Sequence, residues 1–177
     1  MSSIFTIGHS THGPDEFVAL LNGAGLEAIA DVRRFPSSRR LPHFNALALA
    51  ETLEREGIAY VQLGDALGGR RKPREGTANT GWRVAGFRGY ADHMASAEFR
   101  SALADLERIG RERRTAFMCA EGPWWRCHRQ LIADALLVRG WTVRHVMPDG
   151  RIEPHRLTPF AVVEGDSVSY PQGSLGG

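Results

Sequence analysis

Two patterns of apolar and polar positions alternate along the chain. Short runs rich in isoleucine, valine, phenylalanine and alanine end at glycine or at a polar residue, which is typical of buried strands. These runs are residues 4–8, 28–33, 58–63, 115–120 and 142–147. Between them, apolar residues recur every three or four positions, which predicts helices that bury one face. The helical segments are residues 15–22, 46–56, 90–109 and 127–139, with a break expected near Ser96.

The regular alternation of strand and helix favours right-handed crossovers and a parallel sheet. The sequence therefore predicts the α/β class: a three-layer sandwich with a mainly parallel sheet of about five strands, flavodoxin-like or Rossmann-like, and helices on both faces. We assign residues 1–150 to this single domain and residues 151–177 to a C-terminal extension that is partly irregular. The extension mixes proline, glycine and polar residues, so we expect one short hairpin there and loose order over residues 165–177.

Composition narrows the class of protein. The 177 residues are 42% hydrophobic and 24% charged, which is ordinary for a globular domain. No apolar run is long enough to cross a membrane, and the N-terminus lacks the pattern of a secretory signal. We therefore expect a cytoplasmic protein. Its two cysteines are too few for a disulfide framework, and a reducing compartment would keep them as thiols.

Reactive side chains follow several of the predicted strands. In parallel α/β sheets, ligands bind outside the carboxyl ends of the strands. The residues at these ends are His9, Ser10, Asp31, Arg33, Cys119 and Glu121, with Cys127, His128 and Arg129 opening the helix after the fourth strand. The other ends of the strands carry mostly serine, alanine, glutamate and threonine. The sequence therefore places a candidate active site at the carboxyl edge.

Several motifs at this edge occur together. They are GHST at 8–11, DVR with a nearby proline at 31–36, and CAE…CHR at 119–129, followed by a helix and GWTVRHV at 140–146. Together they resemble the bacterial domain of unknown function 488, over a match that runs from Ile4 to about Met147. The resemblance supports the fold and the location of the site, and it implies no particular reaction.

Glu121 and Asp31 are the candidate acid–base residues. Carboxylates on neighbouring strands can share a cleft, where burial raises one pKa and leaves the other group ionised. The alternative is that Asp31 forms a structural ion pair with Arg33 or Arg129.

Cys119 is a candidate nucleophile, because a strand end before a helix N-terminus can lower a thiol pKa. The segment superficially resembles the phosphate loop of cysteine phosphatases and rhodanese-type sulfurtransferases, which have an arginine six positions after the cysteine. Here Arg126 comes seven positions later and the intervening GPWW is bulky, which argues against that chemistry. Cys119, Cys127 and His128 are weak metal-ligand candidates, since their spacing matches no usual zinc pattern. We predict no cofactor.

The histidines and Ser10 are supporting candidates. His9 and His128 would assist catalysis, while Ser10 and the backbone N–H groups after the first strand would bind phosphate or orient a substrate. The alternative for Ser10 is a role in stabilising the turn. If Cys127 faces the core, His128 and Arg129 point toward the cleft. There the arginine would form an ion pair with a carboxylate or a bound anion.

Two basic clusters lie in the loops after the second and third predicted strands. They are Arg33, Arg34, Arg39 and Arg40, and then Arg70, Arg71, Lys72 and Arg74. Both loops belong to the carboxyl edge, as do Arg126, Arg129, Trp124 and Trp125. Arginine binds phosphate through paired hydrogen bonds, and exposed aromatic rings stack on bases. The alternative is that these loops only solvate a surface, since a third basic cluster at 108–114 lies at the opposite edge.

These residues predict an enzyme that acts on nucleic acid or on a phosphorylated nucleoside-like ligand. Glu121 and Asp31 would hydrolyse a glycosidic or ester bond, in the manner of a DNA glycosylase. The arginines would bind phosphate, and Trp124 or Trp125 would stack beside a base. Two alternatives stay open: a non-catalytic module that binds nucleic acid or another anion, and cysteine-based redox or metal chemistry. No membrane partner is predicted.

Overall fold

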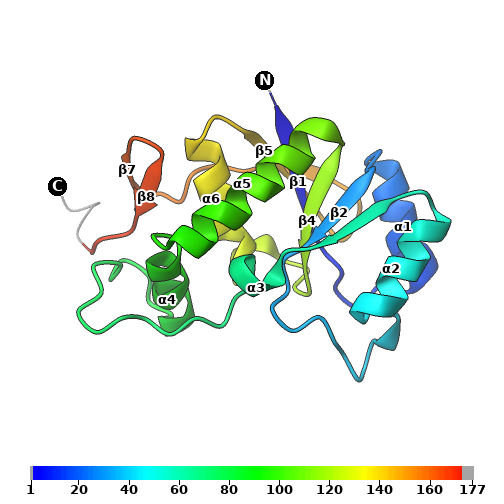
Figure 1. The fold of residues 1–177 in the computed structure, drawn as a ribbon, viewed down its shortest axis with the longest axis horizontal. Coiled ribbons are helices and arrows are strands. Elements are labelled where there is room, and N and C mark those ends of the chain that lie inside the picture. Colours follow the sequence, from blue (N-terminus) through cyan, green and yellow to red (C-terminus); the bar gives the residue numbers. More distant parts are fainter. Residues whose placement is uncertain (1, 173–177) are drawn as a thin grey trace.

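A computed structural model describes residues 2–172 of the chain (Figure 1). In this part of the chain, six strands form one sheet in the order β3-β2-β4-β1-β5-β6. The strands are β1 (Ser3–Gly8), β2 (Ala28–Asp31), β3 (Ala59–Gln62), β4 (Thr115–Cys119), β5 (Thr142–Val146) and β6 (Ile152–Pro154). The first five pair in parallel, which confirms all five predicted strands, and β6 adds an antiparallel edge beside β5.

Within residues 2–172, six helices connect or cover the strands. They are α1 (Pro14–Gly23), α2 (Ala46–Arg55), α3 (Gly64–Leu67), α4 (Ala85–His93), α5 (Ala97–Glu112) and α6 (Arg129–Val138), with single 3₁₀ turns η1 (Pro42–Phe44) and η2 (Trp124–Arg126). The expected break near Ser96 is confirmed. The Ser96 side chain accepts a hydrogen bond from the Phe99 N–H and so caps α5.

The helices lie in two layers, one on each face of the sheet (Figure 1). Alternate residues of β4 point to opposite faces, as the pleat requires. Ala116 and Met118 pack into the cluster that includes α1 and α2, whereas Phe117 and Cys119 pack into the cluster that includes α4, α5 and α6. This arrangement confirms the α/β three-layer sandwich with helices on both faces. Within residues 2–172, no helix has the length and apolar character needed to span a bilayer.

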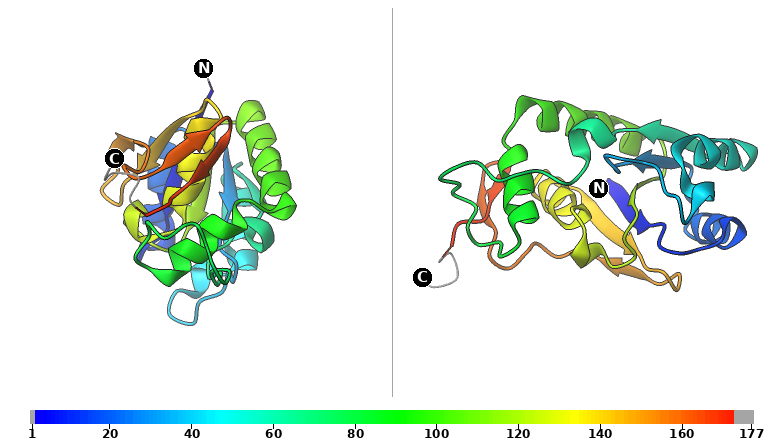
Figure 2. Two further views of the ribbon diagram at one scale, coloured as in Figure 1. Left: turned by 90° about the vertical axis from the view of Figure 1, so that its left-hand side faces the viewer. Right: turned by 90° about the horizontal axis from the view of Figure 1, so that it is seen from below.

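The C-terminal segment is more ordered than its composition predicts. Strand β7 (Val162–Glu164) and strand β8 (Ser167–Ser169) form the expected hairpin, which packs beside α6 (Figure 2). The next residue, Tyr170, is fully buried, and its hydroxyl donates to Asp134 at 2.7 Å. The expectation of loose order is therefore wrong for residues 167–170, because a buried hydrogen bond anchors them. Residues 173–177 lie outside the described residues.

Candidate functional site

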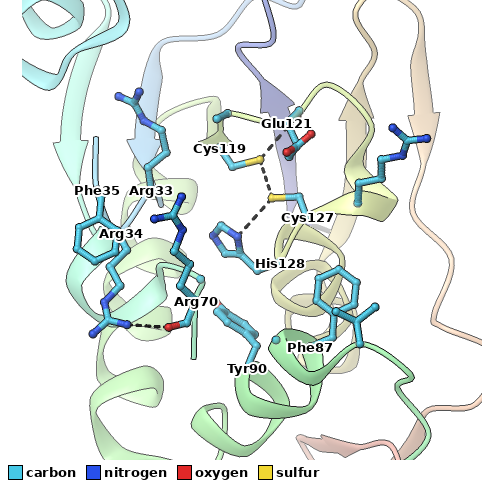
Figure 3. Close-up of a pocket in the computed structure, with 15 residues that line it drawn as sticks. Arg33, Arg34, Phe35, Arg70, Phe87, Tyr90, Cys119, Glu121, Cys127 and His128 are labelled. Carbon is cyan, nitrogen blue, oxygen red and sulfur yellow. Dashed lines mark hydrogen bonds between the residues drawn. The ribbon is translucent and has the colours of Figure 1, made fainter. Parts of the chain in front are cut away.

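The carboxyl ends of β2 and β4, which are adjacent in the sheet, open into a cleft of about 320 Å³ (Figure 3). Its walls come from the segment after β2, the loop after α3, the start of α4 and the segment between β4 and α6. The lining residues are Arg33, Arg34, Phe35, Gly69, Arg70, Val84, Gly86, Phe87, Tyr90, Cys119, Ala120, Glu121, Arg126, Cys127 and His128. The cleft therefore lies at the edge where parallel sheets bind their ligands.

Two cysteines face each other at the base of this cleft. Cys119 is the last residue of β4, and Cys127 comes just before α6. Their sulfur atoms lie 2.6 Å apart, and both are free thiols. Their residues are only 2% and 5% exposed, yet both line the cleft. The sequence made Cys119 a candidate nucleophile and left Cys127 as a weak metal-ligand candidate or a core residue, and the structure brings the two together.

Arg129 lies directly behind this pair and is completely buried. Its Nε is 3.0 Å from the Cys119 sulfur, and its other nitrogens donate to the carbonyl oxygens of Glu121 and Gly122 and to the Thr6 hydroxyl. The expectation that Arg129 points into the cleft is therefore wrong. Its guanidinium is needed to hold the backbone that carries Glu121.

A buried guanidinium needs a compensating negative charge, because it stays protonated and its desolvation is costly. Among the described residues, no carboxylate forms an ion pair with Arg129. Its guanidinium contacts the Cys119 sulfur, and its backbone N–H donates to the Cys127 sulfur at 3.5 Å. The arrangement therefore favours one thiolate shared by the cysteine pair.

The two thiols have pKa values that diverge. Burial raises the pKa of Cys119, and its hydrogen bond to Cys127 adds to the rise. Burial also opposes ionisation of Cys127, but the hydrogen bond from Cys119 and the charge of Arg129 outweigh it and lower the pKa of Cys127. Because the groups are coupled, the pair titrates as a unit, with Cys127 as the more acidic member.

His128 is oriented to accept a hydrogen bond from the Cys127 thiol. Its Nε2 lies 2.9 Å from the Val32 carbonyl oxygen, which can only accept, so Nε2 carries the ring proton. The free lone pair of Nδ1 then faces the Cys127 sulfur at 3.3 Å. Burial lowers the pKa of His128, which keeps the ring neutral at physiological pH.

The residues after β1 support the site from behind. A Cβ on Gly8 would lie 1.6 Å from the Glu121 carbonyl oxygen, so only glycine lets β1 approach the segment after β4 so closely. The N–H groups of His9 and Ser10 donate to the carbonyl oxygens of Cys119 and Ala120. These N–H groups are therefore already paired, contrary to the expectation that they bind phosphate. Ser10 itself adopts a left-handed φ of 50° and does not line the cleft.

Asp31 is a structural residue in this fold. It is completely buried, forms an ion pair with Arg33 at 2.7 Å and accepts a hydrogen bond from the Tyr60 hydroxyl at 2.6 Å. It does not line the cleft, so the expectation that it shares a cleft with Glu121 is wrong. The Asp31 side chain lies beneath the cleft, and the Arg33 guanidinium donates a hydrogen bond to each of its two carboxylate oxygens.

His9 also lies outside the cleft. It is 3% exposed and stacks on Phe44 with ring centroids 4.2 Å apart. Burial lowers the pKa of His9 to about 4, and the Arg33 charge contributes to the same shift. Its ring packs as a neutral aromatic group.

Two arginines at the mouth of the cleft lie beside an exposed phenylalanine, and a third lines the cleft from the η2 turn. Phe35 is 59% exposed, and the guanidinium groups of Arg34 and Arg70 each lie 5.5 Å from its ring centroid. Arg70 has a left-handed φ of 60°, which is strained for a residue with a side chain, and its carbonyl accepts from Arg34 at 2.9 Å. Arg126, on the η2 turn, is the third exposed arginine that lines the cleft.

The other predicted anion-binding residues lie elsewhere. Arg71 lines an adjoining depression of about 450 Å³ with Arg34, Arg70, Lys72 and Arg74. Arg39 and Arg40 are exposed, and neither of these two cavities includes them. Trp124 stacks on His145 with ring centroids 4.4 Å apart, and Trp125 is half exposed outside the cleft. The tryptophans are thus not placed to stack on a base bound in the cleft.

Sequence reasoning missed the wall supplied by α4. Val84, Phe87 and Tyr90 line the cleft opposite the cysteines. Tyr90 is fully buried, and its hydroxyl donates to the Leu67 carbonyl at 2.7 Å. The sequence predicted a helix only from Tyr90 onward, whereas α4 already begins at Ala85, and no motif signalled that this segment returns to the carboxyl edge.

A buried polar chain behind the cleft was also missed. The Thr6 hydroxyl bonds to His145 at 2.6 Å, His145 bonds to His155 at 2.9 Å, and His155 bonds to Asp134 at 2.7 Å. This chain links Arg129, at the start of α6, to Asp134 on the same helix and to His155 in the C-terminal segment. Within the described residues, no three histidine, cysteine, aspartate or glutamate side chains are grouped to hold a metal ion.

The comparison with known families has one result. The model of the family described as "Domain of unknown function DUF488" matches residues 13–136. No curated protein and no solved structure matches the chain. The matched segment includes Asp31, Cys119, Glu121 and the Cys127–Arg129 motif, which the resemblance had singled out. The chain belongs to the DUF488 family.

Proposed function

We propose that this protein is an enzyme that hydrolyses a small phosphorylated, nucleoside-like substrate bound in the cleft. The observation that carries this proposal is the combination of an arginine-lined mouth with a carboxylate in one cavity. A volume of about 320 Å³ is in the range of small-ligand sites. We therefore favour a nucleotide-sized molecule over a polymer.

The mouth of the cleft supports binding of phosphate. Arg34, Arg70 and Arg126 line it, and guanidinium groups bind phosphate through paired, charge-assisted hydrogen bonds. Phe35 and Phe87 supply exposed or half-exposed aromatic surface in the same cavity. Such rings stack on a base without requiring a particular sequence.

Glu121 is the carboxylate among the residues that line the cleft. Its side chain is exposed, while its backbone is held by Arg129 at 2.6 Å. In the proposed reaction, Glu121 accepts a proton from water as the water attacks, and returns a proton to the leaving group. Because Asp31 is paired beneath the cleft, this scheme uses one carboxylate in place of the two that the sequence suggested.

Nucleotide binding tests the proposal. We expect adenosine and guanosine monophosphates and diphosphates to bind the purified protein in calorimetry at low salt. Arg70→Ala and Arg126→Ala should each weaken binding about tenfold or more, because each removes a charge-assisted hydrogen bond. The affinity should fall as salt rises.

The matched control is the double variant Arg39→Ala/Arg40→Ala. It removes two exposed positive charges from the segment after β2 that do not line the cleft, so nucleotide binding should be nearly unchanged. If this control weakened binding as much as the cleft variants, the cleft would not be the binding site. If none of these nucleotides bound at low salt, the proposal would be overturned.

A further inference from the structure

We propose that Cys119 and Cys127 form a reversible dithiol–disulfide couple that reduces small, negatively charged disulfides entering the cleft. This redox activity goes beyond the proposed hydrolysis and does not depend on it. It uses two sulfur atoms that the hydrolytic scheme leaves without a role.

The contact between the sulfur atoms is the first observation. At 2.6 Å they already touch, so forming a bond between them requires little backbone movement. Cys119 is fixed at the end of a central strand, and Cys127 is fixed just before a helix. Both line the cleft, and Figure 3 shows their sulfur atoms side by side within it.

The surroundings of the pair favour a reactive thiolate, which is the second observation. Arg129 supplies a buried positive charge next to Cys119, and the His128 lone pair faces Cys127. A thiolate, and not a thiol, is the nucleophile in disulfide exchange. Apolar burial alone would leave two unreactive thiols. The Arg129 guanidinium beside Cys119 and the His128 ring nitrogen beside Cys127 indicate instead that the pair is reactive in disulfide exchange.

The charge at the cleft mouth selects the substrate class. Arg34, Arg70 and Arg126 line the mouth, with Glu121 as the acidic residue among the lining residues. This net positive charge attracts disulfides that carry carboxylates and disfavours cationic ones. Glutathione disulfide and cystamine are small probes of these two kinds.

The reaction proceeds in two exchanges. The Cys127 thiolate attacks one sulfur of the external disulfide, forms a mixed disulfide and releases the first external thiolate. Cys119 then loses its proton to that thiolate and attacks the Cys127 sulfur, which releases the second external thiolate. Two electrons pass from the protein sulfurs to the external disulfide, which leaves one protein disulfide, one external thiol and one external thiolate.

The experiment uses the reduced full-length chain. It is incubated with glutathione disulfide or with cystamine at equal concentration, and free thiols are counted after denaturation, with intact mass in parallel. Because the chain contains two cysteines, loss of both thiols without added mass identifies the internal disulfide. We expect glutathione disulfide to give this product. Cystamine should form it at a rate at least about tenfold lower. Dithiothreitol should reduce the internal disulfide back to two thiols.

Single variants separate the two roles. Cys119→Ser should stop at a mixed disulfide on Cys127, seen as the added mass of one glutathione, and Cys127→Ser should react at least about tenfold more slowly. Retention of both thiols in the wild type, disulfide-linked dimers as the main product, or faster oxidation by cystamine would each overturn the proposal. Nucleotide binding is measured without disulfide reagents, so failure of either proposal is recognised independently of the other.

Discussion

At the residue scale, Arg129 shows how one buried charge organises the site. It contacts the Cys119 sulfur and two backbone carbonyls in the segment after β4. In a low-dielectric interior these contacts both orient Glu121 and favour ionisation of the cysteine pair. The sequence predicted that Arg129 would pair with a carboxylate or a bound anion in the cleft, but the side chain lies behind the cleft, and no carboxylate among residues 2–172 forms an ion pair with it.

Glu121→Gln tests the carboxylate. The change keeps the shape of the side chain and removes its ability to take a proton, so turnover should fall about a hundredfold or more. Turnover is measured by chromatography of bases, nucleosides and phosphate released from the nucleotides that bind. Calorimetric affinity for the same nucleotides should change little. Unchanged turnover in this variant would remove Glu121 from the mechanism.

The buried His9 makes stability depend on pH. Burial holds its pKa at about 4 in the folded protein, below the ordinary value of 6.5. Between these values the unfolded chain binds the proton and the folded chain does not. Folding stability is therefore fully present above about pH 6.5 and declines as the pH falls toward 4, by up to about 1.4 kcal/mol per pH unit for this group.

Urea denaturation between pH 7.5 and 4.5 measures this dependence. His9→Asn removes the titrating ring, so the stability of the variant should fall less steeply with decreasing pH than that of the wild type. The comparison concerns the slope and not the absolute stability. Equal slopes in the two proteins would show that His9 is not the group responsible.

At the scale of the elements, the site depends on how closely β1 approaches the segment after β4. The apolar runs predicted both strands, because burial on two faces leaves a continuous apolar signal. They could not predict that β1 and β4 are neighbours, since strand order depends on long-range pairing. Gly8 follows from that pairing: its hydrogen atom faces the Glu121 carbonyl oxygen.

Gly8→Ala should be strongly destabilising. The new Cβ would lie 1.6 Å from a backbone oxygen, so the segment between β4 and η2 must shift. We expect a loss of about 3 kcal/mol or more in urea denaturation. The control is Gly23→Ala at the end of α1, where an added Cβ meets nothing within 4 Å and stability should change by less than about 1 kcal/mol. A similar small effect at both positions would contradict the close packing at Gly8.

At the scale of the whole molecule, basic residues serve different purposes at the two edges of the sheet. At the amino-terminal edge, Arg114 lies over the Phe5 ring at 4.4 Å and donates to the Ala24 carbonyl. At the carboxyl edge, Arg34 and Arg70 surround an exposed ring at the mouth of a cleft. Sequence clusters of arginine alone do not distinguish these roles, because the distinction depends on what the fold places beside each side chain.

The same limit applies to the candidate site as a whole. Strand ends and the CAE…CHR motif located Cys119, Glu121 and His128 at the cleft, because parallel topology sends all strand ends to one edge. The pairing of Asp31 with Arg33, and the role of Tyr170 in anchoring the C-terminal segment, depend on tertiary contacts that no local pattern reveals.

A pH titration of thiolate absorbance in the reduced protein tests the central claim, which is that the cysteine pair in the cleft holds one negative charge beside Arg129. We expect one thiol to ionise below the ordinary cysteine pKa of about 8.5 and the other above it. Cys127→Ser should abolish the early step. Ionisation of both thiols at or above about 8.5 would contradict the account.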